Sequence, residues 1–400
     1  MFEESAIQRG EKVFSEPLVL PKWPHCHRET EAKLIEVYRS LKWGMRGKYE
    51  QLLEKEFAAY HGTEYCVWMA NGTTTLECAL LALGIGAGDE VIIPGLTWIA
   101  TGTAVLYTGA TPVIVDIEPD TLCIDPERIE EAITPRTKAI IPVHLFSAVA
   151  DMDRIAKIAE KYNLFVVEDC AHAHGAQWDG KGVGSLGDVG SFSFQMTKLM
   201  TAGEGGACTT SDKRLAERIF RLSHIGNSNF NPGTMPESDL LCRNYRFTEF
   251  QAAIIYDQLQ YLGEEMEKRI ANAGILEQGI KNTPGITVQN HGRKTTRPAI
   301  YFPTFLLKPE ELRPGTSRKD IFKALEAEGM WLGEAWGCPM YKSLMWNIPE
   351  DKFVKMDTPV SEDAAYNRIM ASSNTLYLCE PEQVKKAAEA IDKVMRNYAV

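Results

Sequence analysis

The chain has 400 residues, of which 44% are hydrophobic and 24% charged, so it can bury a large core and disorder is not expected to dominate. Its 43 Lys and Arg stand against 54 Asp and Glu, a formal net charge of −11, which argues against binding to a nucleic-acid backbone. The N-terminal residues lack the apolar core of a signal peptide, and no run of about 20 uncharged apolar residues could span a bilayer. We therefore expect a cytoplasmic protein with no nucleic-acid or membrane partner.

The cysteines indicate free thiols rather than disulfides or a metal site. Nine of them are scattered at wide intervals without a C-x-x-C pair, which is typical of a reducing compartment. His25, Cys26 and His27 are adjacent, but neighbouring residues cannot easily share one tetrahedral ion. We interpret them as part of a polar N-terminal loop, and no metal is expected.

From Tyr65 to about Thr210, short β-branched runs alternate with helical patterns, which predicts a parallel sheet covered on both faces. The run KAIIPVHL is apolar almost throughout, as a strand buried on both faces should be. The predicted strands are 65–69, 90–93, 112–116, 138–143, 164–168, 189–193 and 206–210, and the predicted helices are 74–84, 98–109, 126–133 and 151–161.

After Arg243 the pattern changes, and some thirty positions show apolar residues at helical spacing. We predict a long connecting helix over 248–282, between a large domain at 1–247 and a small C-terminal α+β domain at 283–400. The small domain should contain a strand at 300–307, a helix at 317–329 with Ser317 as its N-cap, and an amphipathic helix at 381–397.

The segment FVVEDCAHAHGA describes a hydrophobic strand that ends at Asp169, after which the chain continues in small residues. A carboxylate at the carboxyl end of a strand points into the crevice where α/β proteins bind ligands. Aspartate also caps helices and closes turns, and this segment alone favours that interpretation.

A second segment, DVGSFSFQMTKLMTAGEGGACTTSD, leads from a strand through Ser193 to Lys198 and then to a glycine-rich loop. A lysine among apolar and small residues is either a surface residue with its ammonium in water or a desolvated amine, and surface lysines are far commoner. Desolvation would lower its pKa and make a neutral nucleophile available to a carbonyl. Schiff-base chemistry is then possible.

Two further features belong to the same predicted sheet edge. CVWMANGTTTLECALLAL is a strand that stops at a glycine and opens a helix with threonines, which suits a phosphate dianion but is also ordinary architecture. Trp98 begins the next helix and could stack on a planar ring or simply pack. An amine, a carboxylate, a phosphate cup and a flat apolar wall are together what pyridoxal phosphate requires.

In these residues the chain resembles the DegT/StrS family of sugar aminotransferases, which are aspartate-aminotransferase-like (fold type I) enzymes. The resemblance runs through YEQLLEKEFAAYHGTEYCV, NGTTTLECALLALGIGAGDEVIIPGLTWIATGTAV, VHLFSAVADMD, VEDCAHAHGA, the Lys198 segment and NYRFTEFQAA, and it is looser in the C-terminal third. It implies an α/β fold of PLP fold type I, with a mainly parallel seven-stranded sheet in the large domain and a small C-terminal α+β domain.

The resemblance implies three catalytic residues. Lys198 would hold pyridoxal 5'-phosphate as a Schiff base and later move the proton, with pyridoxamine phosphate as intermediate. Asp169 would pair with the pyridinium nitrogen and keep it protonated. His172 would lie beside the phenolic oxygen of the cofactor.

The remaining cofactor contacts follow from the same resemblance. Gly72 and Thr73 would bind the phosphate through the helix N-terminus, and Ser193 would add a hydroxyl. Trp98 would stack on the ring, and Ala171 would lie against its other face.

Asn244, in NYRFTEFQAA, matches a family residue that reaches the phosphate of the neighbouring subunit's cofactor, which implies a homodimer with shared active sites. A helix cap before the long helix is almost as compatible with the sequence. The chain departs from the family at Ser147 and Ala148, where many members carry Gly-Gln, and at NGTTT, where SGTAA is commoner. Both changes leave the chemistry possible and could change the fit of the substrate.

The start of the chain and the run SFQMTKLMTAGEGG look similar to the branch with inosose aminotransferases and aminohydroxybenzoate synthases. The implied activity moves an amino group from glutamine or glutamate to a keto-sugar or keto-cyclitol, such as an inosose, by a ping-pong mechanism. Alternatives are an aminohydroxybenzoate-synthase-type enzyme, a dehydratase, or a non-catalytic regulator that binds the cofactor. A Rossmann protein is disfavoured because no G-x-G-x-x-G follows the first strand.

Overall fold

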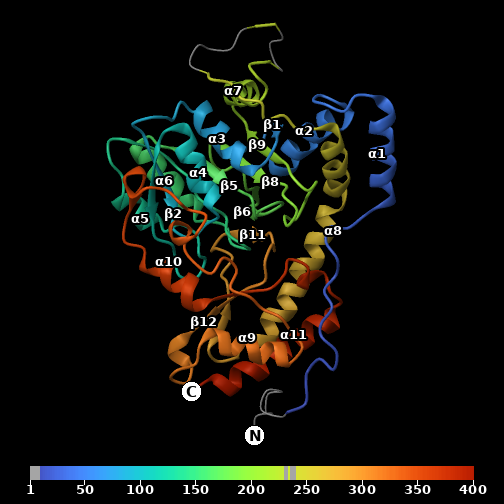
Figure 1. Cartoon of the computed structure of the whole chain (residues 1–400), viewed down its shortest axis with the longest axis vertical. Helices are drawn as coiled ribbons and strands as arrows, with labels where there is room; N and C mark the ends of the chain where they lie inside the picture. The colour runs from blue at the N-terminus through green and yellow to red at the C-terminus, as the bar shows by residue number, and fades with distance from the viewer. Residues whose placement is uncertain (1–9, 229–232, 235–239) are drawn as a thin grey trace.

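The computed structural model of the protein describes residues 10–228, 233–234 and 240–400 (Figure 1). Its centre is an eight-stranded sheet with the order β1-β9-β8-β5-β4-β2-β3-β13. The strands are β1 (Tyr65–Met69), β2 (Glu90–Pro94), β3 (Thr111–Val115), β4 (Thr137–Ile140), β5 (Phe165–Asp169), β8 (Val189–Ser193), β9 (Gly206–Thr210) and β13 (Val354–Lys355). The first seven correspond to the predicted strands. The eighth is a two-residue edge strand, too short to give a periodic signal.

The sheet is mainly parallel, as predicted. Strand β9 runs antiparallel to both β1 and β8, and the other pairs of the described sheet are parallel. Strands β5 and β8 are neighbours, with Asp169 opposite Ser191. The carboxyl ends of these two strands therefore lie side by side at one edge of the sheet.

Both faces of the sheet are covered by helices. Successive strand residues alternate between two hydrophobic cores, so that Ile92 and Val166 lie in one core while Ile93 and Val167 lie in the other. This explains the continuous apolar runs of the strands. The first core includes residues of α2 (Lys48–His61), α5 (Pro126–Glu131) and α6 (Met152–Tyr162), and the second includes residues of α3 (Gly72–Ala82), α4 (Ile99–Thr108) and α7 (Lys213–Ser223).

The predicted long helix is α8 (Glu249–Ile280), which has 32 residues. Thr248 is its N-cap and forms a capping box with Gln251, which explains where the helix begins. Helix α1 (Arg28–Ser40) lies beside α8 (Figure 1). In Figure 1, α8 descends from the level of the large sheet to the level of α11.

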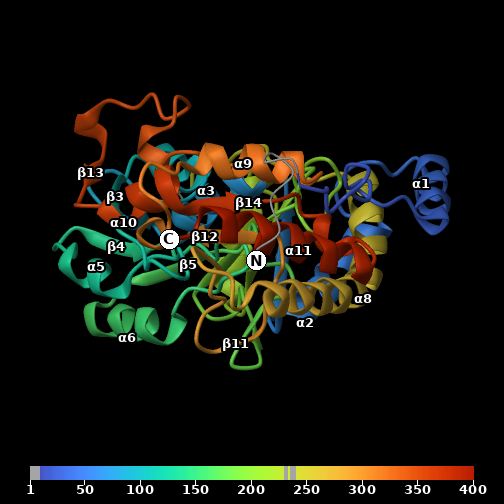
Figure 2. The ribbon, with the colours of Figure 1, turned by 90° about the horizontal axis from the view of Figure 1, so that it is seen from below.

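A second sheet has the order β10-β12-β14, and its strand β12 lies in the lower part of the view in Figure 1. In Figure 2, which shows the molecule from below, β12 and β14 lie near the middle of the view. Its strands are β10 (Ile286–Val288), β12 (Thr304–Leu307) and β14 (Ile369–Ala371), and they share a separate hydrophobic core with α9 (Arg318–Ala327) and α11 (Pro381–Tyr398). Ser317 caps α9 as predicted. The strand predicted over 300–307 starts only at Thr304, because Pro303 has no backbone N–H for a ladder. The domain boundaries stay a prediction.

The remaining elements are short. They are helix α10 (Pro359–Asp363), a π-helical turn at Ala364–Arg368, and 3-10 turns at Pro309–Glu311, Met340–Lys342, Glu350–Lys352 and Leu376–Leu378. A third, small sheet joins β6 (Gln177–Trp178), β7 (Lys181–Gly182) and β11 (Thr295–Arg297).

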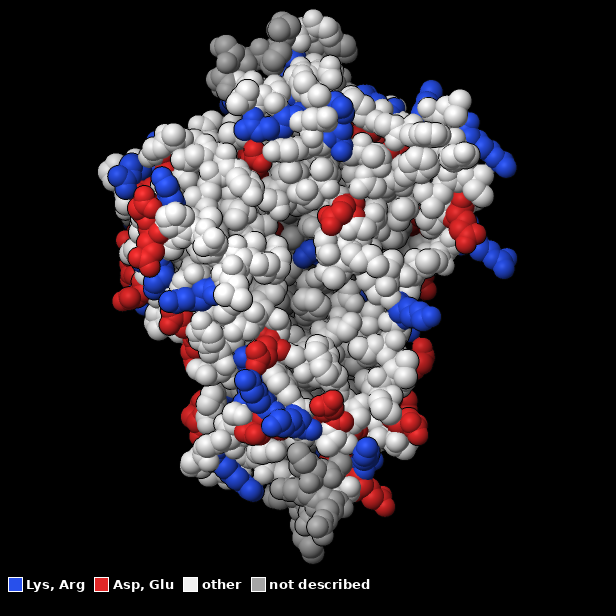
Figure 3. Space-filling view, in the orientation of Figure 1, with Lys and Arg blue, Asp and Glu red and all other residues white. Residues whose placement is uncertain are grey.

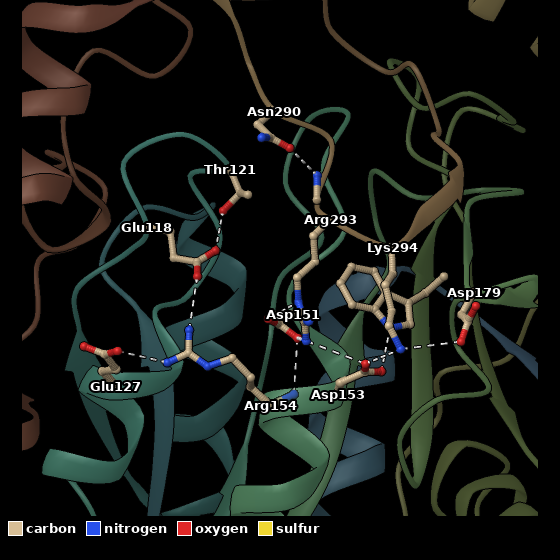
Figure 4. Close-up of polar contacts among 12 residues, drawn as sticks. Glu118, Thr121, Glu127, Asp151, Asp153, Arg154, Asp179, Asn290, Arg293 and Lys294 are labelled. Atoms are coloured by element: carbon tan, nitrogen blue, oxygen red, sulfur yellow. Dashed lines mark hydrogen bonds and ion pairs between the residues drawn. The ribbon is translucent and has the colours of Figure 1, made fainter.

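Ion pairs fasten the turn before β11 to the start of α6 (Figure 4). The Arg293 guanidinium donates to both carboxylate oxygens of Asp151, at 2.8 and 2.9 Å. Asp151 also caps α6 by accepting the N–H of Arg154 at 3.2 Å. Lys294 pairs with Asp153 at 2.6 Å. Paired, charge-assisted bonds of this kind fix the direction of both segments.

All nine cysteines are unpaired, as predicted. The two histidines of the N-terminal run contact α8, where His25 Nδ1 lies 2.9 Å from Glu265 and the His27 ring stacks on Tyr261 at 4.3 Å. Within the described residues, no helix combines the length and the apolar character needed to cross a membrane.

Glu168 is a fully buried carboxylate that supports the end of β5. Its Oε1 accepts the N–H groups of Leu186 at 2.7 Å and Gly187 at 2.8 Å. Its Oε2 accepts the N–H of Gly184 at 2.9 Å and lies 3.1 Å from His144 Nε2. The loop before β8 is thereby attached to β5.

We predict that Glu168→Gln lowers the free energy of unfolding by about 2 kcal/mol, because the new NH2 group faces backbone donors whichever way the amide is turned. Urea unfolding followed by circular dichroism measures this change. The matched control is Glu127→Gln, since the Glu127 side chain is 73% exposed and its replacement should have little effect. Equal unfolding midpoints for the Glu168→Gln and wild-type proteins would contradict the prediction.

Candidate active site

A cavity of about 900 Å³ opens at the carboxyl edge of the large sheet. The face drawn in Figure 3 is hollowed near its middle, with charged side chains of both signs around the hollow. Eight of the nine residues that the resemblance assigns to the site line this cavity. They are Gly72, Thr73, Trp98, Asp169, Ala171, His172, Ser193 and Lys198.

Lys198 lies in the wall of the cavity, five residues after the end of β8. Burial lowers the pKa of its amine to about 8, and the nearby Asp169 carboxylate opposes this shift. Its Nζ lies 4.9 Å from the centre of the Tyr301 ring. A substantial fraction of the amine is therefore neutral near pH 8, which is the form that attacks a carbonyl.

Asp169 ends β5 and is buried, with its carboxylate held by two donors. Oδ1 accepts the backbone N–H of Ala171 at 3.2 Å, and Oδ2 accepts the Thr101 hydroxyl at 2.9 Å. Thr97 lies 2.8 Å from the Thr101 hydroxyl, and since that hydroxyl proton goes to Asp169, Thr97 is the donor between the two threonines. Burial raises the pKa of Asp169, although these bonds and Lys198 oppose the shift.

The N-terminus of α3 presents open backbone N–H groups at the cavity. Asn71 is the N-cap and accepts the N–H of Thr74 at 3.0 Å, whereas the N–H groups of Gly72 and Thr73 have no partner within the described chain. A Cβ at Gly72 would lie 2.7 Å from the Cβ of Ser193, so a glycine is required for this close approach. Two open N–H groups and a serine hydroxyl at a helix N-terminus suit a phosphate.

His172 is buried between aromatic rings and has a defined tautomer. Its Nδ1 accepts the backbone N–H of Phe146 at 3.3 Å, so the ring proton is on Nε2. The Tyr301 ring lies 4.3 Å away on a tilted plane, and the Phe146 ring lies 5.9 Å away and nearly parallel. Burial lowers the pKa of His172 well below its usual value, so the ring is neutral and donates through Nε2.

Trp98 forms the open side of the cavity. It is the residue before α4, it is 44% exposed, and its ring centre lies 6.2 Å from that of Trp336. Ala171 lines the same cavity and is small enough to leave room for a flat ring. An apolar slot of this kind suits a planar aromatic ligand.

Asn244 does not line the cavity, and its backbone pairs with His224 instead. Ser147, one of the two departures from the family pattern, also faces elsewhere. Its backbone N–H donates to Gln289 at 3.3 Å and its hydroxyl donates to the carbonyl of Phe302 at 3.2 Å. Ser147 thus does not line the cavity itself, but it bonds to the backbone of Phe302, which does.

The sequence did not reveal several residues of the cavity wall, among them Gln195, Tyr301 and Trp336. Gln195 is three residues before Lys198, and this short distance in sequence is the feature that could have indicated its place in the cavity wall. Tyr301 and Trp336 come from the C-terminal third, where the resemblance is looser. Thr101, which supports Asp169, follows Thr97 at helical spacing, but threonine pairs at this spacing are common.

Comparisons with known proteins identify the family of the chain. The model of the DegT/DnrJ/EryC1/StrS aminotransferase family matches residues 24–392. An L-glutamine:2-deoxy-scyllo-inosose aminotransferase of Streptomyces paromomycinus is 43% identical over 427 aligned positions, which cover 100% of this chain and 99% of that protein. A protein of the same name from Streptomyces fradiae is 37% identical over 426 positions, with the same shares.

Among solved structures, the crystal structure of 3-amino-5-hydroxybenzoic acid synthase is similar, with a TM-score of 0.85 and 30% sequence identity. The match covers 96% of this chain and 100% of that one. The chain therefore belongs to the DegT/DnrJ/EryC1/StrS aminotransferase family and has the fold type I architecture of pyridoxal-phosphate-dependent transaminases, as the resemblance predicted.

Proposed function

We propose that this cavity binds pyridoxal 5'-phosphate and that the enzyme transfers the amino group of glutamine to a keto-cyclitol, with Lys198 as the covalent attachment point. The observation that carries the proposal is that a desolvated amine and a buried carboxylate line one cavity, where the adjacent strands β5 and β8 end. Groups with shifted pKa values that face a cavity of about 900 Å³ are typical of a functional site.

The residues present fit the cofactor. The open N–H groups of Gly72 and Thr73 and the Ser193 hydroxyl would hold the phosphate. Asp169 would bind the protonated ring nitrogen. Burial raises the pKa of this carboxyl group, and a bound cation would lower it again by favouring the charged carboxylate. When bound, pyridoxal phosphate supplies an electron sink for negative charge on the substrate carbon next to the amino group.

Lys198 would then act as a proton carrier. An amine with a pKa of about 8 exchanges protons readily near neutral pH. It could therefore take the proton from the α-carbon of the donor and return it to the aldehyde carbon of the cofactor. His172, neutral and protonated on Nε2, would donate a hydrogen bond to the phenolic oxygen and does not compete as a base. Trp98 would cover the ring from the open side.

The choice of substrates rests on the relatives. Two full-length relatives are named for L-glutamine as donor and 2-deoxy-scyllo-inosose as acceptor. The acceptor is a polyhydroxylated ring, which suits a cavity that combines aromatic walls with polar groups. Glutamate as donor and a keto-sugar as acceptor are the corresponding alternatives.

We further propose a homodimer in which Asn244 reaches the phosphate in the neighbouring subunit. Asn244 lies outside the cavity of its own chain, and Tyr245, next to it, lies in the cavity wall. In a symmetric dimer, a residue so placed could contact the site of the second copy.

Lys198→Ala should abolish covalent attachment of the cofactor. Borohydride reduction of the wild-type protein loaded with pyridoxal phosphate should tag one peptide, the one that contains Lys198, as measured by mass spectrometry. Lys319→Ala is the matched control, since Lys319 is exposed and lies outside the cavity. A tag of undiminished yield in the Lys198→Ala protein would refute the assignment.

The rate of covalent cofactor attachment to the cofactor-free protein should rise with pH through about 8. Burial lowers the pKa of Lys198 to about 8, so the neutral amine becomes abundant at a lower pH than for an ordinary lysine, whose pKa is 10.5. Stopped-flow absorbance at a series of pH values measures the midpoint. A midpoint near 10.5 would contradict the proposed desolvation.

L-glutamine should bleach the visible absorbance of the loaded protein, and 2-deoxy-scyllo-inosose should restore it, because the two half-reactions run in sequence. The control acceptor is myo-inositol, which has no ketone and should restore nothing. A non-catalytic regulator would show no bleaching by glutamine. Bleaching without recovery would contradict the proposed acceptor.

A further inference from the structure

The residues just before Lys198 form a turn, here called the lysine loop (residues 195–198). Gln195 Oε1 accepts two bonds from Thr197, one from its backbone N–H and one from its hydroxyl, both at 2.9 Å. A backbone N–H can only donate, so the amide atom that faces it must be the oxygen. The orientation of the Gln195 amide is therefore determined by the loop itself.

Tyr301 completes a chain of hydrogen bonds to this amide. Its hydroxyl lies 2.7 Å from the Thr197 hydroxyl. Thr197 has one hydroxyl proton and gives it to Gln195, so the proton between Tyr301 and Thr197 must come from Tyr301. Burial raises the pKa of Tyr301 to about 12, so this phenol keeps its proton. The bonds run in one direction, from Tyr301 to Thr197 to Gln195.

The consequence concerns the nitrogen of Gln195. Its Nε2 has no hydrogen-bond partner in the described residues, and Gln195 lines the cavity three residues before Lys198. We propose that the Gln195 amide is a substrate-binding donor, which presents its N–H groups to an acceptor oxygen of the substrate, and that Thr197 and Tyr301 are positioning residues that hold it in this orientation.

The inference rests on the proposed function, because the ligand must carry acceptor oxygens beside the reacting carbon. Both substrates of the proposed reaction do. A keto-cyclitol offers ring hydroxyls, and glutamine offers its α-carboxylate. A site with a donor fixed in place discriminates strongly against analogues that lack the matching oxygen.

The lysine loop is held from outside as well. Asn374 Nδ2 donates to the carbonyl of Thr197 at 2.8 Å, and the Trp23 indole donates to the carbonyl of Met196 at 3.1 Å. These partners come from near the end and near the start of the chain. The loop therefore has little freedom to rotate the Gln195 amide away from the cavity.

The test is Gln195→Glu, which keeps an oxygen for Thr197 and replaces the NH2 group by a second oxygen. We expect KM for at least one substrate to rise by about 10-fold or more with a smaller change in kcat, because the lost bond is made in the ground state and in the transition state alike. Gln278→Glu, at an exposed position on α8, is the control for the added charge.

A second series separates positioning from contact. Thr197→Val removes the hydroxyl but keeps the backbone N–H, so KM should rise by about 2- to 5-fold, as expected for one neutral hydrogen bond. Thr197→Ser restores the hydroxyl and should restore KM. Tyr301→Phe keeps the ring over Lys198 and leaves Thr197 donating to Gln195, so KM should rise less than in Thr197→Val. Covalent cofactor attachment should be unchanged in all of these variants.

A readout without turnover comes from calorimetric titration of L-glutamine and of 2-deoxy-scyllo-inosose into the Lys198→Ala protein, with and without Gln195→Glu. A weaker Kd for the cyclitol alone assigns the amide to a hydroxyl, and a weaker Kd for glutamine alone assigns it to the carboxylate. KM and Kd values within twofold of the parent for both substrates would overturn the inference. Wild-type protein that fails to aminate the cyclitol would instead overturn the proposed function.

Discussion

The structure depends on one constraint: parallel strands place their carboxyl ends at the same edge of a sheet. Because β5 and β8 are parallel neighbours, the pairing of these two strands is enough to bring Asp169 close to the residues that follow Ser193. Glycines then allow close approach at this edge. A Cβ at Gly206 would lie 2.4 Å from the backbone of Asn71, just as one at Gly72 would collide with Ser193. The cavity is the space that remains between these elements and the C-terminal part.

Two adjacent carboxylates on β5, Glu168 and Asp169, have different surroundings because their side chains point to opposite faces of the strand. Neighbouring residues of a strand point to opposite faces. Glu168 points toward the loop before β8 and is satisfied by three backbone N–H groups and His144. Asp169 lies in the cavity wall, where burial raises its pKa and leaves it receptive to a cation. The first carboxylate fixes the position of the strand end, and the second is available for a ligand.

The sequence predicted the seven main strands and the long helix well, because buried parallel strands and a capped helix leave strong periodic signals. It also indicated Asp169, which ends a strand, and Lys198, which follows one. It could not reveal β13, whose two residues have no period, or the late start of β12 after Pro303. Nor could it reveal that Tyr301 contacts Thr197 across 104 residues, because such a contact depends on how the two parts of the chain pack. The roles of the site residues remain proposals that the geometry supports.

The anchoring of the lysine loop has a further consequence for binding. Trp23, Asn374 and Tyr301 hold the loop through hydrogen bonds made within the chain itself. The entropy lost in ordering this segment is therefore a cost of folding and does not reduce ligand affinity. In the proposed function, a preorganised loop would leave the Lys198 side chain as the main group that moves. Trp23 and Asn374, which lie far from the loop in sequence, would thus support the proposed turnover without touching the reacting atoms.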